Sequence, residues 1–205
     1  MDVVRSKQGR YPVLISLSGV PGAGKTTLAT SLVQWLNNAM PECGAIAMSI
    51  DGYHRLRAEL SAAEMEHRGS PPTFNAAQLL ADLVRLKRTG VLDAPSFDHA
   101  VGDPRPNAIA IRSNNHVVIV EGLYLLLQQD EEWKSIARLF DFKVYLKVPL
   151  HVSTERVARR HMKAWNWPYE RALARAQGND LTNARLVDAS AIHADLVVET
   201  ALAKL

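Results

Sequence analysis

The sequence of 205 residues contains one cysteine, Cys43, and no apolar run long enough to cross a bilayer. A single cysteine excludes an intrachain disulfide and a cysteine-based metal cluster, which is typical of proteins from a reducing cytosol. A membrane-spanning helix needs about 20 consecutive apolar residues. We therefore expect a cytoplasmic protein without a membrane partner, in which Cys43 is a small buried hydrophobic residue beside a strand.

The sequence also has little excess charge of either sign, because 24 lysines and arginines face 21 aspartates and glutamates. The basic residues gather mainly in ERVARRHMK and the segment after it, without an aromatic platform or a known nucleic-acid motif. We therefore expect no nucleic-acid partner. We interpret the clustered basic residues as groups that bind phosphate inside an active site. The apolar N-terminal stretch lacks a small-residue cleavage site, so it predicts a strand rather than a signal peptide.

Glycine is concentrated in one loop, where Ser18 to Thr27 reads SGVPGAGKTT. Its spacing matches the phosphate-binding P-loop pattern G-x4-G-K-[ST]. Glycines let successive N–H groups point at one anion, and a helix that begins near Lys25 adds its positive dipole end. The alternative is a glycine-rich turn that only joins a strand to a helix. The loop predicts nucleoside triphosphate binding through Gly19, Gly22, Ala23, Gly24, Lys25, Thr26 and Thr27.

Five β-rich runs alternate with helical segments: PVLISL, GAIAMSI, HVVIVEG, DFKVYLKV and ADLVVE. Most are nearly continuous apolar stretches, as expected of strands buried on both faces of a parallel sheet. We expect helices over residues 26–38, 76–88, 131–138, 151–160 and 168–177. This alternation predicts an α/β fold, a doubly wound and mostly parallel sheet flanked by helices. One segment interrupts this alternation of strands and helices. It reads DAPSFDHAVGDPRPNAIAIRSNN, and we expect an irregular loop and a short hairpin there.

Acidic residues follow two of the expected strands, where a doubly wound sheet binds its ligands. Asp51 ends AMSID and could face the γ-phosphate and accept a proton from an attacking hydroxyl. Glu121 ends VVIVE, the position of a Walker B acid that holds Mg²⁺ directly or through water. The alternatives are an ordinary Asp-Gly turn at Asp51 and a solvated strand-end acid at Glu121.

A basic helix is expected after DFKVYLKV, with Arg156, Arg159 and Arg160 close together and Arg175 further on. Arginines of a closing lid can stabilise the charge that phosphoryl transfer spreads over the moving group. Arg156 and Arg160 share one helical stripe, so we expect these two, with Arg175 from a second lid helix, to act there. A solvated basic face is the alternative.

The sequence resembles the uridine kinase, phosphoribulokinase and pantothenate kinase family of P-loop kinases from Val13 to about Glu199. The resemblance rests on GVPGAGKTT, SIDGYH, RGSPPTFN, PSFDHAVGDP, VVIVEGLYLLL, RVARRH and GNDLTNARLV. The combination is most similar to a subgroup described as nucleoside/nucleotide kinase-like or fructose-transport-associated kinases. Asn75 stands where pantothenate kinases usually have aspartate.

The resemblance implies ATP and Mg²⁺ as cofactors, a P-loop NTPase fold, and one domain over residues 1–205. Residues 156–180 would form the lid, and residues 53–112 would form an acceptor-side insertion. Thr26 and Glu121 would hold Mg²⁺, Lys25 would bind phosphate and Asp51 would be the base. The acceptor pocket would draw on Tyr53, His54, Arg68, Phe97, Asp98, His99 and Arg105. Dimers are common among relatives, so a homodimer is one expectation.

These residues predict a small-molecule kinase that phosphorylates a hydroxyl of a sugar, nucleoside or pantothenate-like acceptor. One alternative is a regulatory NTPase switch, although the guanine motif N-K-x-D is absent. Another is a kinase-like binding protein that has lost catalysis. Two local questions also stay open. Asn179 and Asn183 could touch the nucleotide or cap helices, and Trp165 and Trp167 could pack the lid or stack on adenine.

Overall fold

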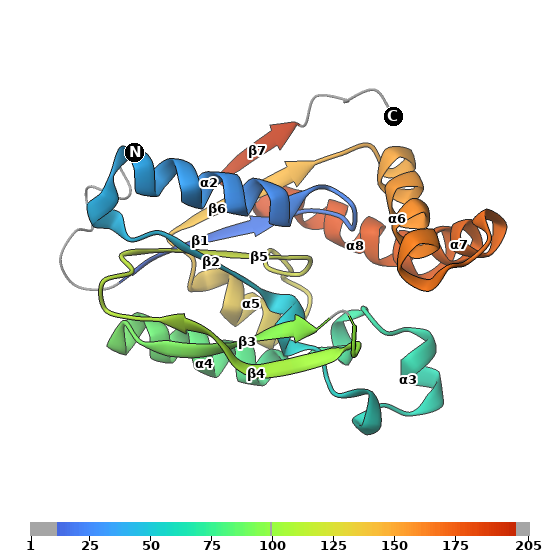
Figure 1. Cartoon of the computed structure of the whole chain (residues 1–205), viewed down its shortest axis with the longest axis horizontal. Helices are drawn as coiled ribbons and strands as arrows, with labels where there is room; N and C mark the ends of the chain where they lie inside the picture. The colour runs from blue at the N-terminus through green and yellow to red at the C-terminus, as the bar shows by residue number, and fades with distance from the viewer. Residues whose placement is uncertain (1–11, 99, 200–205) are drawn as a thin grey trace.

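The computed structural model describes residues 12–98 and 100–199, and a parallel β-sheet forms its centre (Figure 1). The strands lie in the order β2-β5-β1-β6-β7, and each neighbouring pair is parallel. Their bounds are Val13–Ser18 (β1), Ile46–Ser49 (β2), Val117–Gly122 (β5), Phe142–Lys147 (β6) and Leu196–Glu199 (β7). All five predicted strands are present, and the predicted α/β fold is confirmed.

The strand register brings the predicted strand ends to one edge of the sheet. Ser18, at the end of β1, pairs with Gly122, and Ser49, at the end of β2, pairs with Glu121. Parallel strands that end in register place the residues that follow them side by side. The glycine-rich loop, Glu121 and the segment after Ser49 therefore start from the same edge.

Helices cover both faces of the sheet (Figure 1). Helix α2 (Lys25–Ala39) lies on one face, and α4 (Ala76–Thr89) and α5 (Glu131–Arg138) lie on the other. These bounds agree with the predicted ranges to within one residue at each end. Asn75 caps α4, because its side-chain oxygen accepts a hydrogen bond from the Gln78 N–H over 3.0 Å. Within the described ranges, no helix has the length and hydrophobicity that crossing a membrane requires.

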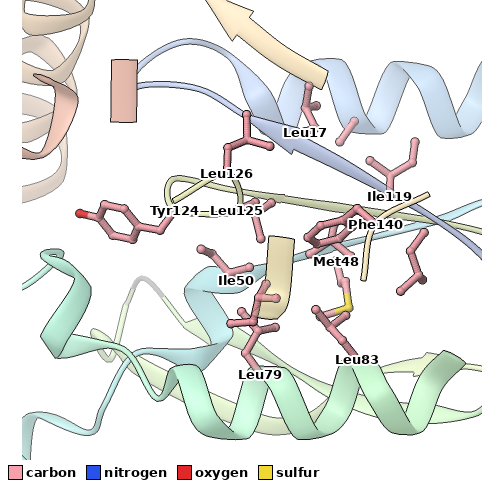
Figure 2. Close-up of a cluster of buried hydrophobic side chains, with 14 of the residues drawn as sticks. Leu17, Met48, Ile50, Leu79, Leu83, Ile119, Tyr124, Leu125, Leu126 and Phe140 are labelled. Carbon is pink, nitrogen blue, oxygen red and sulfur yellow. The ribbon is translucent and has the colours of Figure 1, made fainter. Parts of the chain in front are cut away.

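The main hydrophobic core lies between the sheet and α4 (Figure 2). Leu79 and Leu83 of α4 are fully buried and point toward the sheet, where they face Met48 and Ile50. Their spacing of four residues follows from the helical period, which turns one face of α4 inward. This core fixes the segment that leads from β2 to Asp51.

The segment predicted as an irregular loop and a short hairpin forms one longer hairpin. Strand β3 (Leu92–Asp98) pairs antiparallel with β4 (Asp103–Ile111), with a register shift between Ala94 and Ser96. The prediction of a short hairpin was wrong in length, because Pro104 and Pro106 are tolerated in a strand of a two-stranded sheet. The hairpin packs beside the turn Ile50–Tyr53 that follows β2.

The C-terminal helices form a second, smaller hydrophobic cluster. Helix α6 (Leu150–Trp165) packs against α7 (Tyr169–Arg175), and their contact buries Val157, Ala158, Ala172 and Ala176. Helix α6 begins one residue earlier and ends five residues later than predicted, and the left-handed φ of 51° at Asn166 stops it after Trp165. The π-helical segment Ala176–Asp180, interrupted at Gly178, leads into α8 (Leu181–Ala189), for which no helix was predicted.

One short helix in the acceptor-side region was also missed. Helix α3 (Ala62–Glu66) starts with a capping box, in which Ser61 and Glu64 satisfy each other's backbone N–H groups. The sequence SAAE carries the S-x-x-E signature of this motif. The sequence therefore contained a signal for the start of this helix.

Candidate active site

A cavity of about 450 Å³ opens at the carboxyl edge of the sheet. It is bounded by the glycine-rich loop, the ends of β2 and β5, the hairpin and the C-terminal helices. Its described lining residues are Pro21, Gly22, Gly24, Lys25, Thr26, Thr27, Asp51, His54, Arg68, Gly69, Phe97, Glu121, Gly122, Leu123, Arg160, His161, Trp165, Arg175, Asp180 and Asn183. Most of the residues predicted from the loop, the strand ends and the basic segment therefore meet in one place.

The glycine-rich loop leaves room and N–H groups for an anion. Gly24 has a φ of 94°, and a Cβ atom added there would have no neighbour within 4 Å. Helix α2 begins directly afterwards without a side-chain cap, so its first N–H groups remain available. Ala23 is buried outside the cavity lining, and its N–H donates to the Val20 carbonyl over 3.1 Å. The N–H groups at the start of α2 are therefore free to bind an anion.

Gly19 and Lys25 give the loop its shape. The Lys25 Nζ donates to the carbonyls of Gly19 and Val20 over 2.9 and 3.1 Å. A Cβ atom on Gly19 would lie 2.7 Å from the Leu146 carbonyl oxygen, so only glycine fits there. Burial lowers the pKa of Lys25, and the carboxylates of Glu121 and Asp51 oppose that shift. A phosphate group would supply the negative charge that favours the charged amine.

Glu121 and Thr26 form the pair that fits a magnesium ion. The Thr26 hydroxyl donates to Glu121 Oε1 over 3.0 Å, and Ser49 also hydrogen-bonds the Glu121 carboxylate. Burial raises the pKa of Glu121, and the nearby Lys25 ammonium opposes that shift. Hydroxyl and carboxylate oxygens are the ligands that Mg²⁺ takes together with substrate phosphates. Within the described ranges, no three histidine, cysteine or acidic side chains could hold a metal unaided, so phosphate oxygens would complete the site.

Asp51 lies in the cavity beyond the loop, in the turn that follows β2. Its carboxylate influences both Lys25 and Glu121 electrostatically, and its carbonyl oxygen lies 2.9 Å from His54 Nδ1. Its carboxylate oxygens make no hydrogen bond to any residue that the structure describes. A carboxylate in this position is able to accept a proton from a hydroxyl group in the cavity.

His54, Arg68 and Phe97 form the wall opposite the loop. The His54 ring lies 5.1 Å from the Phe97 ring, and the Arg68 guanidinium lies 5.6 Å from the same ring. Arg68 is held by an ion pair with Asp103 over 2.9 Å and by the carbonyls of Gly102 and Arg55. Three of the predicted acceptor-pocket residues therefore lie together.

Three other predicted acceptor-pocket residues lie outside the cavity lining. Tyr53 is buried outside the cavity lining, and its hydroxyl donates to Asp82 over 3.0 Å. Asp98 accepts hydrogen bonds from Ala100 and Val101 and so closes the hairpin turn. Arg105 is exposed on β4. His99 lies outside the described residues, so the structure does not test it.

The basic side chains of the C-terminal helices point in different directions, and only some of them line the cavity. Arg160 lines the cavity, whereas Arg159 is exposed and pairs with Glu155 over 2.7 Å. Arg156 lies behind the loop, with Nη1 3.4 Å from the Gly22 carbonyl oxygen. Arg175 lines the cavity, and its guanidinium donates to the carbonyls of Glu66 and Arg68. It therefore bridges the C-terminal helices and the acceptor-side segment.

Four of the lining residues between α6 and α8 were not selected from the sequence as site residues. His161, Trp165, Asp180 and Asn183 all face the cavity. The basic motif RVARRH, which indicated Arg160, also contains His161 and could have indicated this residue too. Asp180 and Asn183 lie at the start of α8. The sequence indicated a role only for Asn179 and Asn183, with nucleotide contact and helix capping as the two open interpretations.

The family comparison agrees with this geometry. A model described as the phosphoribulokinase/uridine kinase family matches residues 14–199. The chain belongs to this family. That confirms the resemblance seen in the motifs, and it makes the chain a nucleotide-binding P-loop kinase-family protein.

Individual relatives support the same grouping. The chain is 36% identical over 196 residues to a Schizosaccharomyces pombe protein named "Putative uridine kinase C227.14", covering 91% of this chain and 83% of that protein. It is 32% identical to "ATP-dependent kinase YFH7" of Zygosaccharomyces rouxii, over 73% of this chain but only 49% of that protein. Among solved structures, a "putative fructose transport system kinase" from Silicibacter sp. TM1040 superimposes with a TM-score of 0.87, 29% identity and 96% coverage of each chain.

Proposed function

We propose that this chain is an ATP-dependent small-molecule kinase, which transfers the γ-phosphoryl group of ATP to a hydroxyl group of a sugar, nucleoside or pantothenate-like acceptor. The observation that carries the proposal is the position of Asp51. Its carboxylate lies in the same cavity as the phosphate loop and the wall of His54, Arg68 and Phe97. A hydroxyl group bound against that wall could therefore give its proton to Asp51 as it attacks the γ-phosphorus.

The other residues have separable roles in this proposal. The N–H groups from Gly24 onward and the Lys25 ammonium bind the phosphates, and Arg160 stabilises the charge on the moving phosphoryl group. Thr26 and Glu121 hold Mg²⁺, which when bound neutralises phosphate charge. Asp51 accepts the proton, and this role requires no hydrogen bond to be broken first.

The lid is a further part of the proposal. We assign residues 1–205 to a single kinase domain, with residues 156–180 as its lid and residues 53–112 as its acceptor-side insertion. The separate cluster of Val157, Ala158, Ala172 and Ala176 supports this assignment, because helices with their own small core can move as a unit. Closure of such a lid over the cavity would exclude water from the reaction.

The experiment that tests the proposal replaces Asp51. The Asp51→Asn variant keeps size and hydrogen-bonding capacity but removes the base, so acceptor-dependent turnover should fall about 10²–10⁴-fold with ATP binding unchanged. Asp93→Asn is the matched control, because Asp93 is half-exposed on β3 and pairs with Arg112. Turnover of Asp51→Asn equal to that of the control would overturn the assignment of Asp51 as base.

A further inference from the structure

The start of α8 brings two polar side chains into the cavity. Asp180 and Asn183 are three residues apart, so they lie on the same helical face, and both line the cavity. Asn183 is 5% exposed, and its carboxamide makes no hydrogen bond to any described residue. Its Nδ2 points toward Gly69, 3.9 Å from where a Cβ atom on that glycine would lie. Its amide atoms are not enclosed by protein, so they are accessible to a ligand in the cavity.

Asp180 is held in place from behind by His161. Asp180 Oδ2 lies 2.7 Å from His161 Nε2, and the His161 ring stacks on Trp165 at 4.3 Å with an interplanar angle of 11°. His161 is buried at the base of the lid. The second carboxylate oxygen, Oδ1, makes no hydrogen bond to the described residues. His161 is therefore a positioning residue, and Asp180 presents one free acceptor oxygen to the cavity.

Arg68 fixes the acceptor-side wall beside the start of α8. Its two terminal nitrogens bind Gly102, Arg55 and Asp103, and its Nε is enclosed by protein, so this N–H does not face the cavity. Asn179 Nδ2 donates to the Arg68 carbonyl over 3.3 Å, which ties the residue to the segment before α8. The start of α8 thus supplies a carboxamide and a carboxylate oxygen that line the cavity without partners among the described residues.

The charges at this end of the cavity do not favour an anion. The Arg68 guanidinium is already paired with Asp103, which leaves the Arg175 guanidinium to face the lining carboxylates of Asp51 and Asp180. Burial lowers the pKa of His54, so its ring adds no positive charge at neutral pH, although the Asp51 carboxylate opposes that shift. The positive charges of Lys25 and Arg160 lie at the other end of the cavity, where the proposal places the phosphates of ATP. A second phosphate or a carboxylate on the acceptor would therefore meet more negative than positive charge.

We infer that Asp180 and Asn183 bind the non-reacting hydroxyl groups of the acceptor, and that this acceptor is an uncharged polyhydroxyl compound. The inference rests on the proposed kinase function. Hydroxyl groups fit because each both donates and accepts, and so can satisfy both the Asp180 oxygen and the Asn183 carboxamide. A free sugar and the ribose of a nucleoside share this chemistry.

The test measures transfer from ATP to four groups of acceptors: neutral monosaccharides, nucleosides, sugar phosphates and pantothenate. We expect transfer to a neutral monosaccharide or to a nucleoside. Comparing these two groups shows whether the acceptor is a free sugar or the ribose of a nucleoside. With the best acceptor, Asn183→Ala and Asp180→Asn should each raise the acceptor KM about 3–10-fold, the cost of one lost hydrogen bond, and leave the KM for ATP unchanged. Thr182→Ala, an exposed neighbour on α8, is the matched control.

Thermal unfolding of each variant separates binding from folding, because Asn183 is buried whereas Asp180 is partly exposed. Preference for sugar phosphates or pantothenate, or an acceptor KM unchanged in both folded variants, would overturn the inference and leave the kinase proposal intact. Brisk ATP hydrolysis that no hydroxyl compound alters would overturn the proposed function and this inference together.

Discussion

The Thr26 hydroxyl donates a hydrogen bond to Glu121 Oε1 over 3.0 Å, across 95 positions of the sequence. This bond joins the first turn of α2 to the end of β5 and defines the place where a hard cation would bind. The two residues meet because β1 and β5 are neighbours that end in register, with Ser18 opposite Gly122. The proposed magnesium site is therefore a direct consequence of the strand order.

Replacing Glu121 should change the magnesium requirement more than the affinity for ATP. The Glu121→Gln variant loses one anionic oxygen ligand, so the Mg²⁺ concentration for half-maximal turnover should rise by at least about 10-fold. The measurement is turnover against Mg²⁺ at saturating ATP, with the exposed Glu132→Gln as control. If the Mg²⁺ dependence of Glu121→Gln matched that of the control, Glu121 would not hold the ion.

The same carboxylate predicts how magnesium affinity varies with pH. Burial raises the pKa of Glu121 above its ordinary value of 4.5, so protons compete with Mg²⁺ at a higher pH than at an exposed glutamate. As the pH falls through this raised pKa, more Mg²⁺ should be needed for half-maximal turnover. Titrations of turnover with Mg²⁺ between neutral pH and pH 5 test this. A requirement that stays constant over that range would contradict the assigned ligand.

Arg160 and Arg159 offer a matched pair within one helix. Arg160 lines the cavity, whereas Arg159 pairs with Glu155 on the exposed side. Arg160→Ala should lower kcat about 10²–10³-fold with a much smaller change in the KM for ATP, because the interaction strengthens in the transition state. Arg159→Ala should leave both nearly unchanged. Equal effects of the two substitutions would show that only the general charge of α6 matters.

Gly122 should tolerate no side chain, because the space beside it is filled. A Cβ atom there would overlap the side chain of Ile50, which is fully buried under the sheet. Gly122→Ala should destabilise the fold by about 1–3 kcal/mol. Ile50→Ala removes both overlapping atoms, Cγ1 and Cδ1, so the double variant should lose less stability than the two single substitutions lose together. Denaturant unfolding measures all three variants, and a double variant whose loss equals that sum would refute the packing argument.

The fold was predictable because its strands carry a strong local signal. VVIVEG is buried at every position of β5, which is what a continuous apolar run in a parallel sheet predicts. The hairpin and α8 were harder to predict. Both prolines in β4 argue against a strand, and the Asn-Asp-Leu-Thr-Asn start of α8 has few strong helix formers, so tertiary contacts decide these segments.

The site was predictable where it follows a motif and not where it depends on packing. Lys25, Thr26 and Glu121 follow from loop and strand-end position alone. Tyr53 was selected because it is beside Asp51, yet its ring turns inward to Asp82. Asp180 enters the cavity only because the chain returns after Gly178 to meet His161. The two residues are 19 positions apart, so the motif RVARRH, which ends at His161, does not reveal that they meet.

The central claim is that ATP turnover depends on an acceptor hydroxyl. The most direct measurement is ADP release with and without neutral sugars and nucleosides, with the phosphorylated product identified by mass, in the wild type and in Lys25→Ala. We predict slow release with water alone, stimulation of at least about 100-fold by the correct acceptor, and loss of both in Lys25→Ala. Rapid ADP release that is independent of every acceptor and yields only inorganic phosphate would contradict this account and favour a regulatory NTPase.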